Sequence, residues 1–184
     1  MTEAPRTGKG LVLIGYRGTG KSTVGRILAD RLRLPLVDAD AVLELRFNRP
    51  VSRIFQESGE PRFRDWEEET IAEATSGPPC VLATGGGAVL SEVNRARLKA
   101  FGTVVWLSAG ADVLSERLSR EPGGLSARPP LTAAGTLAEV ATVLAARLPI
   151  YAGLADVEVS TEGRTPDEVA VEVLRTVSQI VATD

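Results

Sequence analysis

The stretch GYRGTGKS at residues 15–22 decides the fold. Its pattern, GxxxxGK[ST], is that of a phosphate-binding P-loop. An apolar run at residues 10–14 precedes it, and apolar residues at helical spacing follow over residues 21–34. In such a loop the backbone N–H groups face the phosphates, the lysine reaches the β- and γ-phosphates, and the serine ligates magnesium. We therefore expect ATP to be bound by the residues of this loop: Gly15, Gly18, Thr19, Gly20, Lys21, Ser22 and Thr23.

The length and composition are those of one globular domain. The chain has 184 residues, of which 43% are hydrophobic and 24% charged. We expect a polar tail at residues 1–9 and a single domain over residues 10–184. The apolar runs are too short for a membrane span or a secretion signal, so no membrane partner is expected.

The residue counts exclude several kinds of chemistry. Cys80 is the only cysteine, so no intrachain disulfide can form, and the lack of a secretion signal favours the cytoplasm. The chain has no histidine, which excludes His-based triads and His-ligated zinc. A net charge of −3 argues against nucleic acid as the main partner.

Short apolar segments alternate with segments of helical periodicity. The expected strands are residues 10–14, 35–37, 80–83, 103–107 and 156–159. The expected helices are residues 21–34, 41–46, 51–58, 62–74, 91–100, 112–120, 136–148 and 165–181. This alternation predicts the α/β class, with an open parallel sheet covered by helices on both faces and ligands at the carboxyl ends of the strands. Proline and glycine residues over 121–130 predict a mobile loop.

Two carboxylates, Asp38 and Asp40, come at the end of the second expected strand. We expect their side chains to point to opposite faces there, which makes two roles available. One carboxylate can hold magnesium near Ser22, and the other can accept a proton from a substrate hydroxyl. The alternative for Asp40 is that it caps the helix that follows.

Three glycines and three arginines are the remaining candidates for binding a substrate anion. Residues 85–87 are consecutive glycines at the end of the third expected strand, where their N–H groups are accessible to an anion. The arginines are Arg64, Arg128 and Arg147. The residues alone favour a solvated surface charge for Arg64, suit Arg128 to a lid that closes on the transferred phosphate, and leave Arg147 open between water and the cleft.

Taken together, these residues resemble the shikimate kinase family over nearly the whole chain. The motifs that carry the resemblance are GYRGTGKST, LVDADAVLE, GEPRFRDWEEE, TGGGAV, ARPPL and ARLPIY, in the family's order and spacing. The resemblance implies a nucleoside-monophosphate-kinase-like P-loop fold with five parallel strands in the order 2-3-1-4-5. It also implies a substrate-binding segment at about residues 40–75, a lid at about residues 121–132, and action as a monomer on ATP and shikimate with Mg²⁺.

The resemblance also implies residue roles. Asp40 would hold the substrate hydroxyls and assist deprotonation, while Lys21 and Arg128 would stabilise the transferred phosphoryl group. The substrate carboxylate and ring would be bound by Arg64, Arg147, Gly86 and Gly87. Ser22 and Asp38 would organise magnesium, and Glu67 would orient an arginine of the pocket. The further ATP contacts would be Arg17 in the loop, Arg120 and Pro166 beside the adenine, and Arg128.

Two alternatives remain at this stage. The first is a kinase for another polyol acid, such as gluconate or quinate. The second is a nucleotide-binding regulator without transfer activity, which would need the P-loop and Asp38 but would have no use for Asp40 or Arg64.

Overall fold

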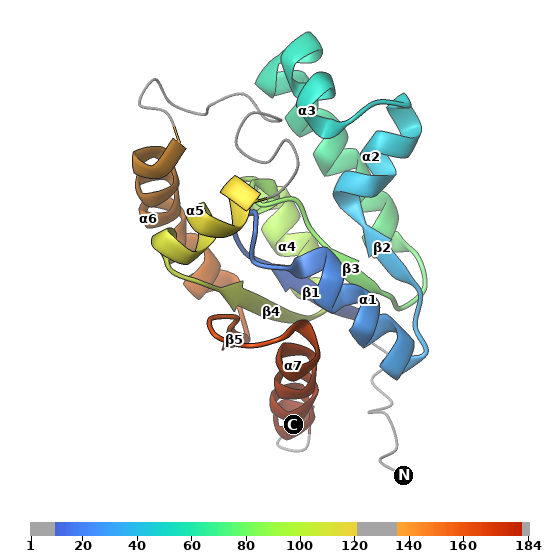
Figure 1. The fold of residues 1–184 in the computed structure, drawn as a ribbon. Coiled ribbons are helices and arrows are strands. Elements are labelled where there is room, and N and C mark those ends of the chain that lie inside the picture. The colour runs from blue at the N-terminus through green and yellow to red at the C-terminus, as the bar shows by residue number, and fades with distance from the viewer. Residues whose placement is uncertain (1–9, 121–135, 182–184) are drawn as a thin grey trace.

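The fold is organised around one parallel sheet. The computed structural model describes residues 10–120 and 136–181. The strands are β1 (Gly10–Ile14), β2 (Leu36–Asp38), β3 (Val81–Ala83), β4 (Gly102–Ser108) and β5 (Val157–Ser160). They lie in the order β2-β3-β1-β4-β5, and every neighbouring pair is parallel (Figure 1). The predicted fold class and strand order are confirmed.

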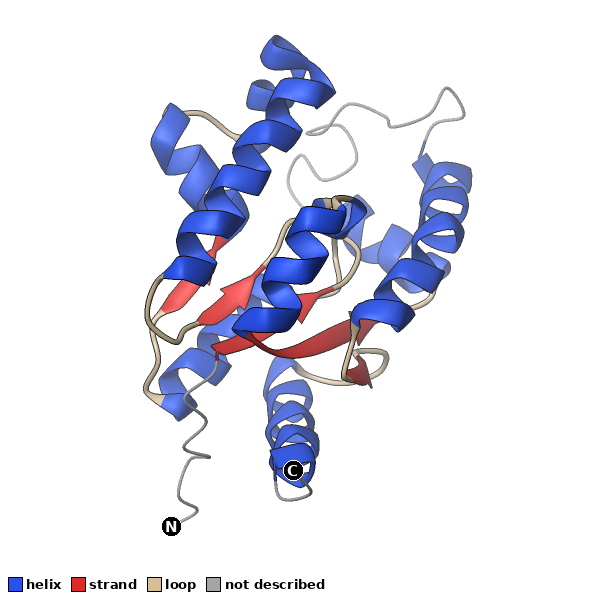
Figure 2. Ribbon diagram, turned by 180° about the vertical axis from the view of Figure 1, so that it is seen from behind, coloured by secondary structure: helices blue, strands red, loops and turns tan. Residues whose placement is uncertain are grey.

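Helices cover both faces of this sheet, as Figure 2 shows from behind. They are α1 (Lys21–Leu32), α2 (Ala39–Phe47), α3 (Val51–Ser76), α4 (Glu92–Phe101), α5 (Ala111–Arg120), α6 (Thr136–Leu154) and α7 (Pro166–Val181), with a 3₁₀ turn η1 (Ala88–Leu90). The turn η1 was not predicted. The other helix and strand ends lie within two residues of the predicted ones, except at the C-terminal end of α6 and at the predicted break inside α3.

The alternation of side chains along the central strand divides the core in two. Leu11 and Leu13 of β1 pack with α1 and α7 on one face, whereas Val12 and Ile14 pack with α3, α4, α5 and α6 on the other. All four side chains are buried. Because β1 is apolar on both faces, it fits only the middle of a covered sheet, which fixes the P-loop at the centre of the carboxyl edge.

A break predicted at Gly59 and Pro61 is present within α3. Gly59 has a φ of 77° and a ψ of 162°, which is not helical, and the helix resumes at once. Pro61 therefore lies in the first turn of the resumed helix, where its missing N–H costs no hydrogen bond. The two predicted helices become one kinked element that carries Arg64 on its second part.

The predicted end of the helix at residue 148 was wrong. Helix α6 continues through Pro149 to Leu154. Tyr151 and Leu154, beyond the proline, are buried, and the Tyr151 ring stacks on Trp106 with the centroids 5.8 Å apart. Burial of these side chains outweighs the local cost of the proline, which is a tertiary effect that a local breaker rule misses.

Two predicted features lie outside the described residues. These are the polar tail at residues 1–9 and the lid at about residues 121–132, which includes Arg128.

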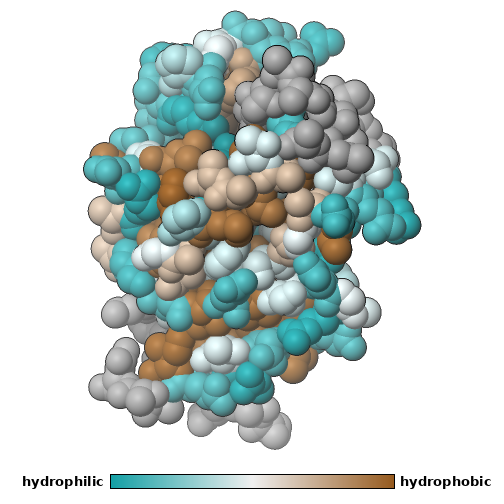
Figure 3. Space-filling view, turned by 90° about the vertical axis from the view of Figure 1, so that its left-hand side faces the viewer, coloured by the Kyte–Doolittle hydropathy of each residue, from teal (hydrophilic) through white to brown (hydrophobic). Residues whose placement is uncertain are grey.

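In the part of the chain that is described, no helix is both long and apolar enough to span a bilayer. The face shown in Figure 3 carries several separate hydrophobic areas between hydrophilic ones.

Candidate active site

The P-loop joins β1 to α1 and turns the N-terminus of α1 toward the carboxyl edge of the sheet. Gly20 precedes the helix with a φ of 86°, a left-handed conformation that favours glycine. Lys21, only 8% exposed, donates hydrogen bonds from Nζ to the carbonyls of Gly15 at 2.8 Å and Tyr16 at 2.9 Å. The ammonium is thus held inside the loop, at the place where a P-loop binds phosphate.

Arg117 of α5 supports this loop, and sequence reasoning missed it. Its Nη1 donates to the Gly18 carbonyl at 3.2 Å and to Thr161 Oγ1 at 2.9 Å, while Nη2 donates to the Thr161 carbonyl at 2.8 Å. The arginine therefore connects the loop to the end of β5. No local motif marks Arg117, because its three acceptors come from segments 44 or 99 residues away in the chain.

A pocket of about 590 Å³, including the part open to solvent, lies beside the P-loop. All five residues predicted to bind the acid line it, as does Arg17, which was predicted to contact ATP. The lining is Tyr16, Arg17, Asp40, Val51, Ser52, Phe55, Phe63, Arg64, Glu67, Gly85, Gly86, Gly87 and Arg147.

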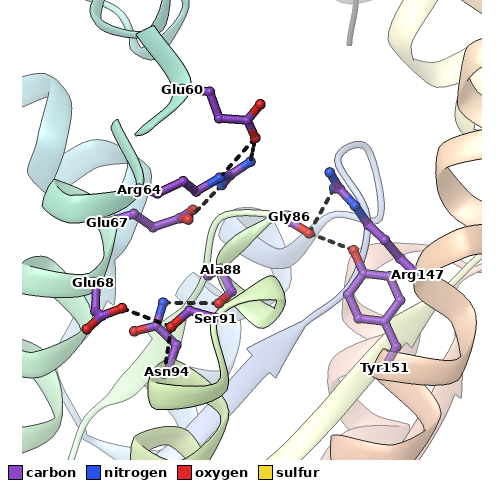
Figure 4. Close-up of polar contacts among 10 residues, drawn as sticks. All are labelled: Glu60, Arg64, Glu67, Glu68, Gly86, Ala88, Ser91, Asn94, Arg147 and Tyr151. Carbon is purple, nitrogen blue, oxygen red and sulfur yellow. Dashed lines mark hydrogen bonds and ion pairs between the residues drawn. The ribbon is translucent and has the colours of Figure 1, made fainter. Parts of the chain in front are cut away.

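Arg64 is held by two glutamates at the side of this pocket (Figure 4). Its Nη1 donates to Glu67 Oε2 at 2.7 Å, and its Nε and Nη2 donate to Glu60 Oε1 at 3.3 and 3.2 Å. Burial lowers the pKa of Arg64, but the charges and hydrogen bonds of Glu67 and Glu60 outweigh it, so that the pKa is raised. The guanidinium is permanently charged and fixed in position, which corrects the residue-based preference for a solvated surface charge.

Glu67 is a buried carboxylate, 2% exposed. Burial raises its pKa, and the Arg64 charge opposes this shift without cancelling it. The predicted pairing of Glu67 with an arginine of the pocket is confirmed as a contact. Its Oε1 atom is buried and has no hydrogen-bond partner in the described part of the chain.

Asp40 lines the same pocket, whereas Asp38 caps the N-terminus of α2. Asp38 Oδ1 accepts the N–H groups of Asp40 and Ala41 at 3.1 and 3.2 Å, so Asp38 is the N-cap of α2 and Asp40 lies in the first helical turn. The capping alternative for Asp40 was therefore wrong. The prediction that the two side chains point to opposite faces of the strand was also wrong, because side chains two residues apart in a strand share a face. The two carboxylates diverge because only Asp38 belongs to the strand.

The glycine turn after β3 lies between these groups. A Cβ atom on Gly85 would lie 2.6 Å from Glu67 Oε1 and 2.9 Å from Asp40 Oδ1. Such distances are too short for carbon next to oxygen, so only glycine lets both carboxylates approach the turn.

Arg147 and Tyr151 bind the next glycine from the other side (Figure 4). Arg147 Nη1 donates to the Gly86 carbonyl at 3.1 Å, and Tyr151 Oη donates to the same carbonyl at 2.7 Å. The alternatives left open for Arg147 are resolved in favour of the cleft, since it is 9% exposed and lines the pocket. Burial raises the pKa of Tyr151 to about 12, against the opposing charge of Arg147, so its hydroxyl keeps its proton at neutral pH.

The apolar wall of the pocket was not predicted. It consists of Val51 and Phe55 from the first part of α3 and Phe63 from the second. Phe55 and Phe63 contact each other across the Gly59 break, with ring centroids 5.3 Å apart. The kink therefore folds α3 back enough to give the pocket an aromatic side.

Two predicted adenine contacts lie at helix ends. Arg120 ends α5, is exposed, and pairs with Glu116, while Pro166 begins α7 and is also exposed. Their assignment as adenine contacts stays a prediction.

The donor set near the P-loop suits Mg²⁺. Ser22 is exposed in the first turn of α1, and Asp38 is fixed by its cap bonds through one of its two carboxylate oxygens. Mg²⁺ prefers oxygen ligands and usually takes only one or two protein groups beside substrate phosphates. Ser22 and Asp38 are therefore the two protein groups that would hold the ion beside the phosphates.

Comparisons with known proteins identify the family of the chain. The family model for shikimate kinase matches residues 17–178. A shikimate kinase of Pseudomonas syringae pv. syringae is 41% identical over 172 residues, which cover 94% of this chain and 98% of the relative. The chain belongs to the shikimate kinase family.

Other members of the family agree in sequence and in fold. A shikimate kinase of Nitrobacter winogradskyi is 47% identical over 148 residues, covering 80% of this chain and 67% of the relative. A solved shikimate kinase from Acinetobacter baumannii, in complex with shikimate, superposes with a TM-score of 0.87 at 32% identity and covers 94% of both chains.

Proposed function

We propose that this chain transfers the γ-phosphoryl group of ATP to the 3-hydroxyl of shikimate, giving ADP and shikimate 3-phosphate. The observation that carries the proposal is one pocket beside the P-loop that contains Arg64, Arg147 and Asp40 around a glycine turn. Membership of the shikimate kinase family supports the same acid and the same donor.

The two arginines suit a carboxylate. Arg64 reaches the pocket from α3 and Arg147 from α6, so an acid bound between them meets cations on two sides. Arginine binds carboxylates through parallel charge-assisted hydrogen bonds. We assign the carboxylate of the substrate to this pair, with the N–H groups of Gly86 and Gly87 as neighbouring donors.

Asp40 is the group proposed to act on the hydroxyl. A carboxylate next to the acceptor hydroxyl can accept its proton as the bond to phosphorus forms, which typically contributes about 10²–10⁴-fold to the rate. Phe55 and Phe63 line the same pocket and would reduce the contact of the acid ring with water.

Lys21 is proposed to stabilise the charge of the transferred group. Its ammonium donates hydrogen bonds to two carbonyls of the loop, and phosphate oxygens would replace them on ATP binding. Ser22 and Asp38 would hold Mg²⁺, which neutralises charge on the β- and γ-phosphates when it is bound. Arg128 is proposed as the lid arginine, and Arg17, Arg120 and Pro166 as further ATP contacts.

A coupled assay of ADP release tests this function. Shikimate should give turnover that far exceeds turnover with quinate or gluconate at equal concentrations. Turnover with gluconate but not with shikimate would identify gluconate as the substrate. If none of the acids stimulated ADP release, the result would favour a nucleotide-binding regulator. We propose further that the chain acts as a monomer in the cytoplasm, which size-exclusion chromatography with light scattering tests for the oligomeric state.

A further inference from the structure

Tyr151 is a buried side chain to which the proposed reaction assigns no role. It is 0% exposed, its ring stacks on Trp106, and its Oη donates to the Gly86 carbonyl at 2.7 Å. It lies in the part of α6 beyond Pro149, one helical turn after Arg147. Residues four apart on a helix share a face, so both side chains reach the same carbonyl oxygen.

This shared carbonyl determines the direction of one peptide group. The peptide bond between Gly86 and Gly87 is trans, since the chain has no cis peptide bonds in its described part. In a planar trans peptide the C=O and the following N–H point in opposite directions. With the Gly86 carbonyl directed at α6, the Gly87 N–H is directed away from α6.

On that other side lies the second arginine of the pocket. A Cβ on Gly87 would lie 2.6 Å from Arg64 Nη2 and 2.8 Å from Arg64 Cζ, so the Arg64 guanidinium packs directly against Gly87. Within the described residues, the Gly87 N–H donates no hydrogen bond. The Gly86–Gly87 peptide therefore connects Arg147 to Arg64 across the pocket and leaves one donor for a ligand.

We infer that Tyr151 is a positioning residue for the acid: its hydroxyl fixes the Gly86–Gly87 peptide between the two arginines so that the Gly87 N–H is presented to the bound substrate. The inference rests on the proposed function, because it assigns the acid to this pocket. Two donors on one carbonyl hold the peptide more firmly than Arg147 alone, whose flexible side chain would otherwise be free to release it.

The test is Tyr151→Phe, which keeps the ring on Trp106 and removes only the hydroxyl. We expect the KM for shikimate to rise roughly three- to tenfold, because one neutral hydrogen bond is lost, while the KM for ATP stays within about twofold. Val173→Ala is the matched control, since Val173 is 0% exposed on α7 and packs on the opposite face of the sheet. It should lower the thermal midpoint and leave both KM values unchanged.

An NMR measurement separates positioning from general destabilisation. Addition of shikimate without nucleotide should shift the Gly87 amide proton downfield in the wild-type chain and clearly less in Tyr151→Phe. The inference is overturned if Tyr151→Phe leaves the KM for shikimate unchanged, raises both KM values equally, or keeps the full Gly87 shift. Wild-type turnover with shikimate is measured separately, so a failure of the proposed function is distinguishable from a failure of this inference.

Discussion

The guanidinium of Arg64 lies where a side chain on Gly87 would be, with Nη2 only 2.6 Å from the place of a Cβ atom. Gly87 itself has a φ of −101° and a ψ of −5°, a conformation that alanine adopts without strain. Glycine is therefore required at this position by the arginine beside it and not by the backbone.

Gly87→Ala should accordingly weaken acid binding while the chain still folds. The methyl group must displace Arg64, so we expect the KM for shikimate to rise on the order of tenfold, as for the loss of one charge-assisted hydrogen bond. The KM for ATP should change little. Steady-state kinetics with each substrate varied in turn give both constants.

Gly153→Ala is the control for this substitution. No atom lies within 4 Å of a Cβ at Gly153, which is exposed on α6. Alanine there should leave both KM values unchanged and stabilise the helix by about 0.5–1 kcal/mol. Equal kinetics for the two variants would contradict the steric account of Gly87.

Arg64 itself gives a graded prediction. Arg64→Ala removes the charge and the planar fork, whereas Arg64→Lys removes only the fork. Charge-assisted hydrogen bonds contribute roughly 1.5–3 kcal/mol, so alanine should weaken shikimate binding by about 10–150-fold and lysine should fall between. Arg53→Ala, an exposed arginine on the same helix, should have no effect on either substrate. Unaltered shikimate affinity in Arg64→Ala would leave the acid specificity without an explanation.

Glu67 predicts a pH dependence of stability. Burial raises its pKa, and Arg64 lowers it by less, so the folded chain binds this proton more tightly than the unfolded chain does. The contribution of Glu67 to the free energy of unfolding is therefore greatest below about pH 4, near the ordinary pKa, and falls as pH rises through the raised pKa.

Urea unfolding of the wild-type chain and of Glu67→Gln across this range measures that contribution. The stability of the wild type relative to Glu67→Gln should decline with rising pH and then become constant. A relative stability that increases with pH would mean that the attraction of Arg64 dominates over burial.

Asp40→Asn tests the proposed proton acceptor. The amide cannot accept the proton, so kcat should fall by about 10²–10⁴-fold, while the KM for ATP changes little. A fall of less than threefold would remove Asp40 from the proton transfer and leave it as a contact to the substrate hydroxyls.

The strands and most helices were predictable because their signals are local. The apolar run of β1, the P-loop and the glycines after β3 each mark a strand end within a few residues. The start of α2 was harder to predict from the sequence, because either Asp38 or Asp40 suits a helix cap. Only the structure shows that Asp38 accepts the N–H groups.

The parts of the site that the residues alone did not predict depend on tertiary contacts. Arg64 pairs with Glu60 and Glu67 one turn away on α3, but its place in the pocket depends on Gly87, which only the fold brings near. Helix α6 passes Pro149 because Tyr151 packs on Trp106 and bonds Gly86. The family resemblance assigned Arg64 and Arg147 to the substrate carboxylate, but it assigned no role to Tyr151 or Arg117.

The most direct test of the central claim is the identity of the product. The wild-type chain, incubated with ATP, Mg²⁺ and shikimate, should give a new ³¹P resonance coupled to the proton at carbon 3 of shikimate, together with one ADP for each phosphate transferred. Lys21→Met should give less than about a tenth of this rate, because loss of such a group costs at least about 2.7 kcal/mol of transition-state stabilisation. Release of ADP without a shikimate phosphate, or equal product from Lys21→Met, would contradict the account.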